Sequence, residues 1–469
     1  MPYKPIAFEV FKYSLKAVEK NLAAGENPVF VDAVPSRYDE FFAMCDDLGV
    51  LEGFEKLTDT RKNPCVPLSA ICVLMMCRFL RCIQSFGQMG EVLLCYAPLL
   101  ERLGIAARES VYNCRRSRQS AKNQTPLKVF DEEVFSEVLR DLDHDELNAI
   151  LTRFITALRQ WKPSLFSEGL FIMDSNHFRI TGTGEEYKWC ALMLRTEYGM
   201  IPVALEFSAT EGEGTGETRV GRKLLERVLN TYGHGFLKTV LMDAGYLDGA
   251  SLRWLKFEQG VDWVLPTREK MVCTNALLGE AADAPKWRWR TVKPPQLNCS
   301  KTKLPTRKML WIENVAHFPE YGAKVNGIVI RDVYSPTETH AEEKTITQCI
   351  ASSNMDLKGA EIHDLWRKRW NIESAFGFMT EYWGLGKWQI RNLAVYEATI
   401  QLMALTYGLV VLQHLRDKLQ PLSLRKLKFR FELQVTSTVL ICCGDACALL
   451  TTKTLNDWMM RGILVVRSP

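Results

Sequence analysis

The sequence predicts a mixed α/β protein in which a β-rich insertion interrupts the α/β core and a helical domain comes first. Three observations support this fold class. Helical periodicity dominates residues 1–165 and returns after Gly359, strand and helix patterns alternate from Gly169 to about residue 270, and residues 271–350 combine prolines with short strand patterns. The middle region reads strand-strand-strand-helix-strand-helix-strand, an order typical of a mixed sheet packed against helices.

The first domain, residues 1–165, is predicted to be helical because Leu, Met, Cys and Arg recur at three- and four-residue spacing from Pro67 to Ile105. A second amphipathic stretch runs from Phe130 to Leu158. The core is expected in two parts, residues 166–270 and 351–418, separated by the β-rich insertion at 271–350. Residues 419–469 form a C-terminal segment whose apolar composition suggests a subunit contact.

The core elements follow one another in a definite order. The expected strands are Gly169–Ile180, Trp189–Thr196, Met200–Ser208, Lys238–Met242 and Val261–Leu265, and the expected helices are Arg219–Tyr232 and Ala250–Glu258. Short strands at Met309–Glu313 and Gly327–Val333 are expected in the insertion. Helices then continue from Gly359 to about Lys418.

The composition is that of an ordinary globular chain, with 47% hydrophobic and 24% charged residues, which excludes wholesale disorder and fibrous repeats. No continuous apolar run approaches the ~18–20 residues of a membrane span. The N-terminus has no apolar segment typical of a secretory signal, so we expect a cytoplasmic protein. The net charge of +4 is too small to indicate a nucleic-acid partner by itself.

The 14 cysteines show neither a disulfide nor a zinc pattern. There is no Cys-x2-Cys pair, and none of the seven histidines stands in ligand spacing with a cysteine pair. Free cysteine packs as a small hydrophobic side chain, so we expect thiols in the core of a protein from a reducing compartment.

Two aspartates close apolar runs that are expected to be buried strands. Asp174 follows Leu170–Met173, and Asp243 follows the run Val240–Met242. A buried carboxylate is costly unless it is paired or binds a cation, and two of them on neighbouring strands would suit a divalent metal. The alternative is that each aspartate caps the helix or turn that follows it.

A third acid, Glu373, lies in the segment LWRKRWNIESAFGFMTEYW. On one helix, Trp366, Arg369, Glu373 and Thr380 would share a face, and the aromatic content of the segment suggests that this face docks on the sheet. A buried Arg369–Glu373 ion pair without a catalytic role is the alternative.

In these three segments the sequence resembles the DDE transposases of bacterial insertion sequences, which have a ribonuclease-H-like catalytic core. It is most similar to the group with a Tyr-x2-Arg-x3-Glu-x6-Lys signature. FIMDSNHF matches the first acid at Asp174, LMDAGYLD the second at Asp243, and RKRWNIESAF the third at Glu373, with Arg369 as the signature arginine. The resemblance covers about residues 100–415 and includes a β-rich insertion between the second and third acids.

The resemblance implies a DNA strand-cleaving and strand-joining enzyme whose three acids are the catalytic residues and bind Mg²⁺, with Mn²⁺ as a substitute. Carboxylate oxygens suit these hard ions, and two-metal phosphoryl transfer is the chemistry that they support. Two positions depart from the signature: Trp366 replaces its tyrosine and Thr380 its lysine. The departures affect contacts to DNA ends more than metal binding.

Two basic stretches are expected to contact DNA. Residues 284–308 hold eight Lys or Arg and no acid, with aromatic side chains interleaved, a composition that suits phosphate contacts and base stacking. The candidates there are Lys286, Trp287, Arg288, Trp289, Arg290 and Lys293. The second stretch contains Arg115, Arg116 and Arg118, in a region that either enters a DNA groove or is a solvated helix. The two tryptophans, two residues apart, would share a face of one strand and either stack on a base or pack together.

The expected partners are double-stranded DNA, as element ends and as target, and further copies of this chain in a homodimer or larger assembly on nucleoid DNA. Two other functions stay open: a transposase-derived protein that binds DNA without strand transfer, and a separate metal-dependent nuclease. The glycine-rich segment Glu211–Lys223 lacks the spacing of a phosphate-binding loop, so no nucleotide cofactor is expected.

Overall fold

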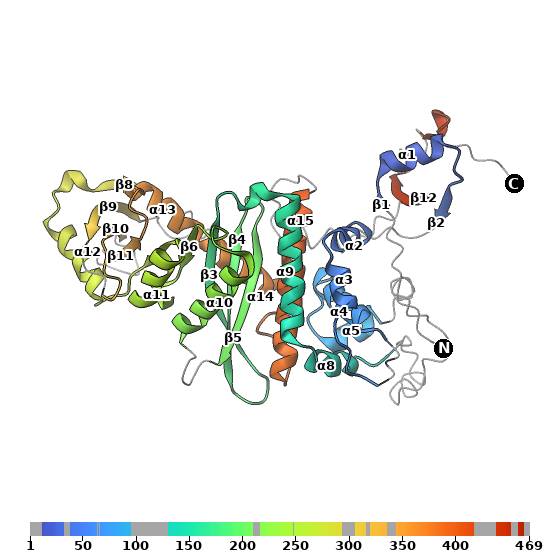
Figure 1. Cartoon of the computed structure of the whole chain (residues 1–469), viewed down its shortest axis with the longest axis horizontal. Coiled ribbons are helices and arrows are strands. Elements are labelled where there is room, and N and C mark those ends of the chain that lie inside the picture. The colour runs from blue at the N-terminus through green and yellow to red at the C-terminus, as the bar shows by residue number, and fades with distance from the viewer. Residues whose placement is uncertain are drawn as a thin grey trace. The chain divides into compact units, whose positions relative to one another are not determined.

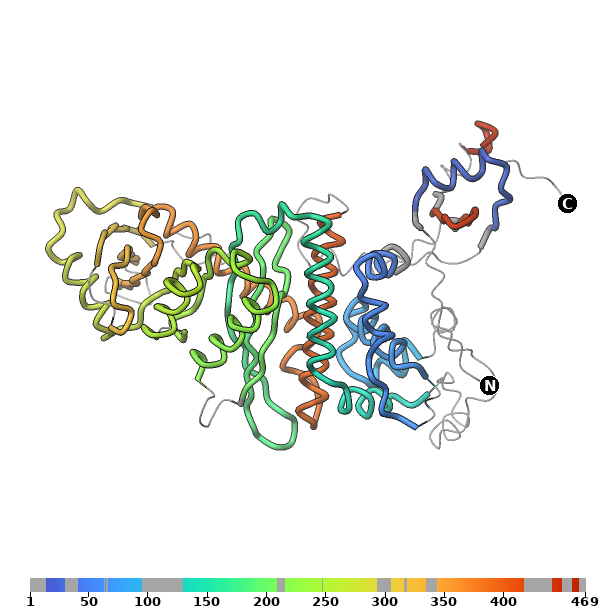
Figure 2. The backbone as a smooth tube through the Cα atoms, in the orientation of Figure 1, coloured from blue at the N-terminus to red at the C-terminus, as the bar shows by residue number. Residues whose placement is uncertain are grey.

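The computed structural model describes residues 12–31, 38–62, 64, 66–94, 130–209, 216–246, 248–292, 305–315, 319–334, 344–416, 438–451 and 458–463. The chain divides into two compact units, which are described separately. The first contains Met1–Gln160, Ile180–Gly184 and Phe378–Pro469, and the second contains Trp161–Arg179 and Glu185–Gly377. The colours of Figure 2 trace the chain through these segments.

The second unit is built on a nine-stranded mixed sheet (Figure 1), which confirms that the chain is a mixed α/β protein. Its order is β5-β4-β3-β6-β7-β11-β10-β9-β8. The neighbours β3, β6 and β7 are parallel, and the other pairs are antiparallel. The strands are β3 (Leu170–Arg179), β4 (Glu186–Arg195), β5 (Met200–Ala209), β6 (Thr239–Met242), β7 (Asp262–Pro266), β8 (Arg290–Val292), β9 (Thr306–Val315), β10 (Val325–Tyr334) and β11 (Lys344–Ser352).

The strands of the predicted insertion extend the core sheet, because β11 pairs with β7. The short strands expected at Met309–Glu313 and Gly327–Val333 are the central parts of ten-residue strands β9 and β10. The sequence reading missed a helix, α12 (Val272–Asp283). Its apolar residues form no clear stripe along the helix, so no helical pattern was recognised. The prolines of this region favoured the prediction of short strands instead.

Helices pack on both faces of this sheet. On one face, Met173 of β3 lies against Gly221 of α10 (Glu217–Tyr232). On the other face, the ring of Trp189 in β4 is 5.1 Å from that of Phe376 in α14 (Trp370–Trp383). α12 packs on β9, β10 and β11, and α13 (Gly359–Lys368) packs on β7, β10 and β11. The predicted helix at 250–258 is α11 (Gly249–Arg253) followed by the π-helical turn η5 (Trp254–Glu258).

The first unit contains the predicted helical region. Its helices are α2 (Tyr38–Asp47), α3 (Val50–Glu55), α4 (Leu68–Leu80), α5 (Phe86–Val92), α8 (Glu133–Arg140), α9 (His144–Trp161, whose last residue belongs to the second unit) and α15 (Leu393–Arg416). α15 packs on α2, α4 and α8. It is long and apolar enough to span a membrane, although the sequence reading found no such run. However, 94% of its most apolar window is buried, which is typical of a core helix.

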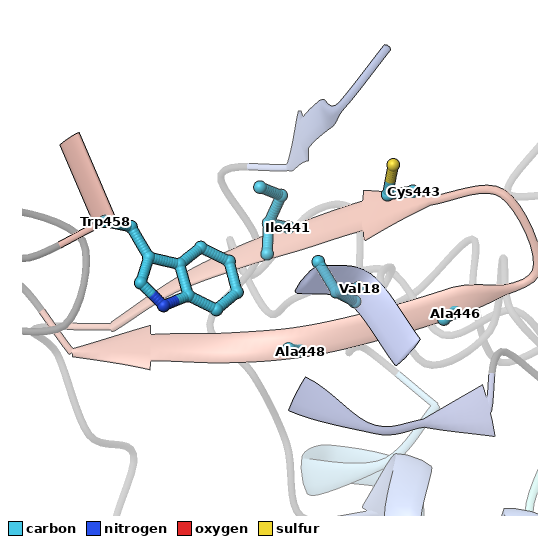
Figure 3. Close-up of a cluster of buried hydrophobic side chains, with 6 residues drawn as sticks. All are labelled: Val18, Ile441, Cys443, Ala446, Ala448 and Trp458. Carbon is cyan, nitrogen blue, oxygen red and sulfur yellow. The ribbon is translucent and has the colours of Figure 1, made fainter. Parts of the chain in front are cut away.

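A small module in the first unit combines a segment that starts at Lys12 with strands that lie after Thr438 (Figures 1 and 2). Its sheet has the order β1-β13-β12-β2, from β1 (Lys12–Tyr13), β2 (Val29–Val31), β12 (Thr438–Cys443) and β13 (Ala446–Thr451), with α1 (Leu15–Ala23) packed on it. Figure 3 shows its buried side chains, which are Val18, Ile441, Cys443, Ala446, Ala448 and Trp458.

This module corrects one prediction. Residues 12–31 were expected to be helical, but they also contain strands whose partners lie about four hundred residues away in the sequence. In the C-terminal segment, the described apolar residues Ile441 and Trp458 are buried within the module. The expected subunit contact of residues 419–469 stays a prediction.

Candidate active site

Asp174 and Asp243 lie next to each other on adjacent parallel strands. Met173 of β3 pairs with Met242 of β6. Asp174 directly follows Met173, and Asp243 directly follows Met242. Asp243 ends its strand as predicted. Asp174 does not, because β3 continues to Arg179 and pairs with β4 along the way. Asp174 is thus in the middle of a strand, and the prediction that it closes the strand was wrong.

Arg369 joins the first and third acids. Its Nη1 donates to Oδ2 of Asp174 at 3.0 Å, and its Nη2 donates to Oε1 of Glu373 at 2.5 Å. The arginine is 7% exposed, and Nε has no partner among the described residues. The predicted Arg369–Glu373 ion pair is therefore present, and it extends to Asp174 on the sheet.

The position of Arg369 comes from a break between two helices. α13 ends at Lys368 and α14 begins at Trp370, so the predicted single helix is two helices. The guanidinium carbon lies 4.8 Å from the ring centre of Trp366 and 5.5 Å from that of Trp370. The indole of Trp366 thus makes a cation–π contact with the guanidinium of Arg369. Thr380 lies farther along α14, in the other unit.

The electrostatics of Asp174 show that the three acids influence one another. Burial raises the pKa of Asp174 to about 6, Arg369 opposes this rise, and the charges of Asp243 and Glu373 add to it. Like charges raise a carboxyl pKa only when they are near, because the interaction falls with distance and with solvent screening. Asp243 and Glu373 are therefore both close enough to act on the charge of Asp174.

A hydrogen-bonded group that the sequence reading missed supports the two aspartates from the opposite face of the sheet. The hydroxyl of Tyr246 lies 2.5 Å from Oγ of Ser175 and 3.1 Å from Sγ of Cys190. Ser175 follows Asp174 directly and donates its backbone N–H to Oδ1 of that aspartate at 2.9 Å. The turn after Asp243 is thus tied to the strand that carries Asp174.

Glycine is required at Gly221, where α10 passes this turn. A Cβ on Gly221 would lie 2.7 Å from the ring of Tyr246 and 2.9 Å from the side chain of Met173. Both distances are far shorter than a van der Waals contact. The close approach of α10 thus fixes the ring of Tyr246, whose hydroxyl makes the hydrogen bonds described above.

The donor set fits a hard divalent cation in its chemistry, since Asp174, Asp243 and Glu373 supply only carboxylate oxygens. Within the described part of the chain, however, no three acidic, histidine or cysteine side chains converge closely enough to hold an ion as they stand. The guanidinium of Arg369 occupies Oδ2 of Asp174 and Oε1 of Glu373. The fit to a metal is therefore one of donor chemistry, while Arg369 holds two of the oxygens in this arrangement.

The basic stretch of the insertion is not one continuous strand. Residues Lys286–Arg288 form the single turn η6, and β8 begins only at Arg290. The side chain of Trp287 is 82% exposed, whereas the ring of Trp289 covers the guanidinium of Arg331 at 4.4 Å. The expectation that both tryptophans share a strand face was wrong, because Trp287 lies in a helical turn and Trp289 precedes the strand.

Strand register divides the basic residues between the two faces of the sheet. Arg290 pairs with Met309, which in turn pairs with Ile330. The pairings across β11, β7 and β6 to β3 place the side chain of Arg290 on the same face of the sheet as that of Asp174. Lys308 pairs with Arg331 on the opposite face. Lys286 is exposed, and Arg288 donates to the carbonyl oxygen of Trp311 at 3.2 Å. Lys293 and the predicted DNA contacts Arg115, Arg116 and Arg118 lie outside the described residues.

Comparisons with known proteins agree with this arrangement. Residues 166–409 match the family described as transposase DDE domain, which is more than half of the 469-residue chain. The chain belongs to this family. No curated protein matches it significantly.

Among solved structures, the chain is similar to a piggyBac transposase synaptic complex with hairpin DNA, determined by cryo-electron microscopy. The TM-score is 0.35 and the identity 11%, over 98% of this chain and 85% of that chain. This similarity is too low to support the fold or the function, and neither rests on it.

Proposed function

We propose that this transposase cleaves DNA at the ends of a mobile element and joins the 3′ ends to target DNA, with Asp174, Asp243 and Glu373 as its catalytic residues. The observation that carries the proposal is the placement of the acids: Asp174 and Asp243 directly follow the paired residues Met173 and Met242, and Arg369 joins Asp174 to Glu373. A ribonuclease-H-like core is supported by the strand order β5-β4-β3-β6-β7 with β3 parallel to β6.

Asp174, Asp243 and Glu373 would hold Mg²⁺, with Mn²⁺ as a substitute. When bound, such ions activate the attacking hydroxyl or water and stabilise the leaving oxygen. The protein itself positions the acids. Ser175 orients the carboxylate of Asp174 through its backbone N–H, and Tyr246 fixes the turn that carries Asp243.

The proposed substrate is double-stranded DNA, bound as element ends and as target. Its phosphates suit the exposed Lys286 and Arg290, and a base suits the exposed indole of Trp287. We further propose that the chain acts as a homodimer or larger assembly, because an element has two ends to process, and that it acts on nucleoid DNA in the cytoplasm.

Substitution of the acids tests this function. Asp174→Ala, Asp243→Ala and Glu373→Ala should each reduce cleavage of DNA from the ends of the element by at least about a thousandfold, while binding of that DNA changes by less than about threefold. The reason is that these carboxylates act on the transition state, whereas contacts to phosphates and bases supply affinity. The measurements are single-turnover cleavage and fluorescence anisotropy with DNA that flanks the gene.

Asp364→Ala is the matched control, because this aspartate of α13 is 70% exposed and lies outside the cluster. It should cleave like the wild type. Wild-type rates in any of the three acid variants would remove that residue from the site. A wild-type protein that binds the DNA but never cleaves it would favour a DNA-binding protein without strand transfer.

A further inference from the structure

Within the described residues, only Asp174 and Glu373 accept hydrogen bonds from the side chain of Arg369. Of its side-chain nitrogens, Nη1 bonds Asp174, Nη2 bonds Glu373, and the buried Nε bonds nothing within the described residues. A guanidinium with five N–H donors is usually better satisfied when its role is only structural. Neither a backbone carbonyl nor any other described side chain accepts a hydrogen bond from it.

The guanidinium and a divalent cation compete for the same oxygens. The atoms that accept from Arg369 are Oδ2 of Asp174 and Oε1 of Glu373. An ion shared by these acids would need at least one oxygen from each. A divalent cation that takes these two oxygens excludes the guanidinium from them, because the lone pairs that would bind the ion are the ones that accept hydrogen bonds from Arg369.

The surroundings give the guanidinium a route toward solvent. Its inner neighbour, Trp366, is 5% exposed, whereas its outer neighbour, Trp370, is 56% exposed. Both rings contact the cation in its present position. Arg369 is the one residue between α13 and α14, and its backbone N–H donates to the carbonyl oxygen of Trp366, so the movement concerns its side chain alone.

We propose that Arg369 is a positioning residue that stands in for the metal ion, holding Asp174 and Glu373 together until a DNA phosphate draws the guanidinium away and the acids become free to bind a divalent cation. The inference rests on the proposed function of the site and goes beyond it, because it couples metal binding to the presence of DNA. By thermodynamic linkage, DNA then strengthens metal binding by the same factor as metal strengthens DNA binding.

The test is the affinity for Mn²⁺ without any turnover, measured from the signal of free Mn²⁺ in electron paramagnetic resonance. Arg369→Met removes the charge but keeps the length of the side chain. We expect it to bind Mn²⁺ about tenfold or more tightly than the wild type in the absence of DNA, since the competing charge-assisted hydrogen bonds are gone. Arg369→Lys should lie between the two, because one ammonium cannot bridge both acids.

A DNA duplex gives the second half of the test. It should tighten Mn²⁺ binding to the wild type several-fold and should change the affinity of Arg369→Met by much less. Arg367→Met is the matched control, because it removes the same charge from an exposed position two residues away. Its Mn²⁺ affinity should stay within about twofold of the wild type, as expected for a solvent-screened charge.

Unchanged or weaker Mn²⁺ binding in Arg369→Met would overturn the inference and would mean that the arginine only braces the acids. If that variant fails to fold, as judged by near-ultraviolet circular dichroism, the comparison of Arg369→Lys with the wild type decides in the same way. Failure of the proposed function looks different. In that case Asp243→Ala would bind Mn²⁺ with the affinity of the wild type, whether or not Arg369→Met changes that affinity.

Discussion

Trp287 and Trp289 are two residues apart and yet have different environments. Trp287 is 82% exposed in the turn η6, while Trp289 lies over the guanidinium of Arg331. An exposed indole beside Lys286 and Arg288 is available to stack on a base. A tryptophan that covers an arginine contributes to folding instead. From the sequence alone, base stacking and packing were both open for each tryptophan, because the helical turn η6 was not predicted.

Alanine substitutions should separate these two roles. Trp287→Ala should weaken binding of end DNA by about five- to a hundredfold, the range of one lost base stack, and leave the melting temperature nearly unchanged. Trp289→Ala should lower the free energy of unfolding by roughly 1 kcal/mol and alter DNA affinity little. Anisotropy and thermal unfolding measure the two effects. Equal DNA affinity of Trp287→Ala and wild type would show that this indole does not contact DNA.

The three acids of the candidate site could be chosen from the sequence because each stands beside a recognisable apolar or aromatic pattern. The bonds among Ser175, Cys190 and Tyr246 could not, since Ser175 and Tyr246 are 71 residues apart and meet only through strand register. The contact of Arg369 with Asp174 spans 195 residues and depends on how α13 and α14 dock. Sequence patterns report local periodicity and carry no register.

At the scale of elements, α13 docks on the extended part of the sheet through a buried histidine. His363 is 4% exposed, and its Nε2 has no partner within the described residues. Burial lowers the pKa of His363, and the charges of Arg307 and Arg367 lower it further. Arg307 is itself held by Asp332 through two hydrogen bonds of 2.7 and 2.6 Å. The histidine is therefore buried in its neutral form.

This burial predicts a loss of stability in acid. Because the folded pKa of His363 lies below the unfolded one, the unfolded chain binds more protons once the pH falls below about 6.5. The free energy of unfolding should then fall by up to about 1.4 kcal/mol per pH unit more in the wild type than in His363→Gln. Urea unfolding at pH 7.5, 6.5 and 5.5, followed by tryptophan fluorescence, measures this. Parallel curves for both proteins would contradict the burial of a neutral histidine.

The order of elements in the core was predictable because alternation and helical periodicity are strong there. All five expected core strands are present, as β3 to β7, with limits within a few residues of the prediction. The continuation of the sheet through β11 was not predictable. β11 pairs with the edge of the core sheet at β7, and the sequence of a strand does not show which strand edge it will pair with.

At the scale of the whole molecule, the two ends of the chain meet in one small sheet. β1 and β2 are two and three residues long, too short to be stable without β12 and β13. Sequence patterns identify such strands poorly, since their stability comes entirely from distant partners and from the cluster around Trp458. The apolar composition of the C-terminal segment indicated that its side chains are buried. It did not show that Ile441 and Trp458 pack with Val18 of α1.

The metal preference of the Asp243→Cys variant tests most directly whether the three acids form a metal-dependent DNA-cleaving site. Asp243 has the advantage that Arg369 does not bond it, so the substitution leaves the Asp174–Arg369–Glu373 contacts in place. A thiolate binds the softer Mn²⁺ better than Mg²⁺. The variant should therefore lose cleavage of end DNA in Mg²⁺ and recover a measurable part of it in Mn²⁺, while Asp243→Ala stays inactive in both. Full activity of Asp243→Cys in Mg²⁺, or equal Mn²⁺-dependent cleavage by Asp243→Ala, would contradict a role for Asp243 in binding the metal.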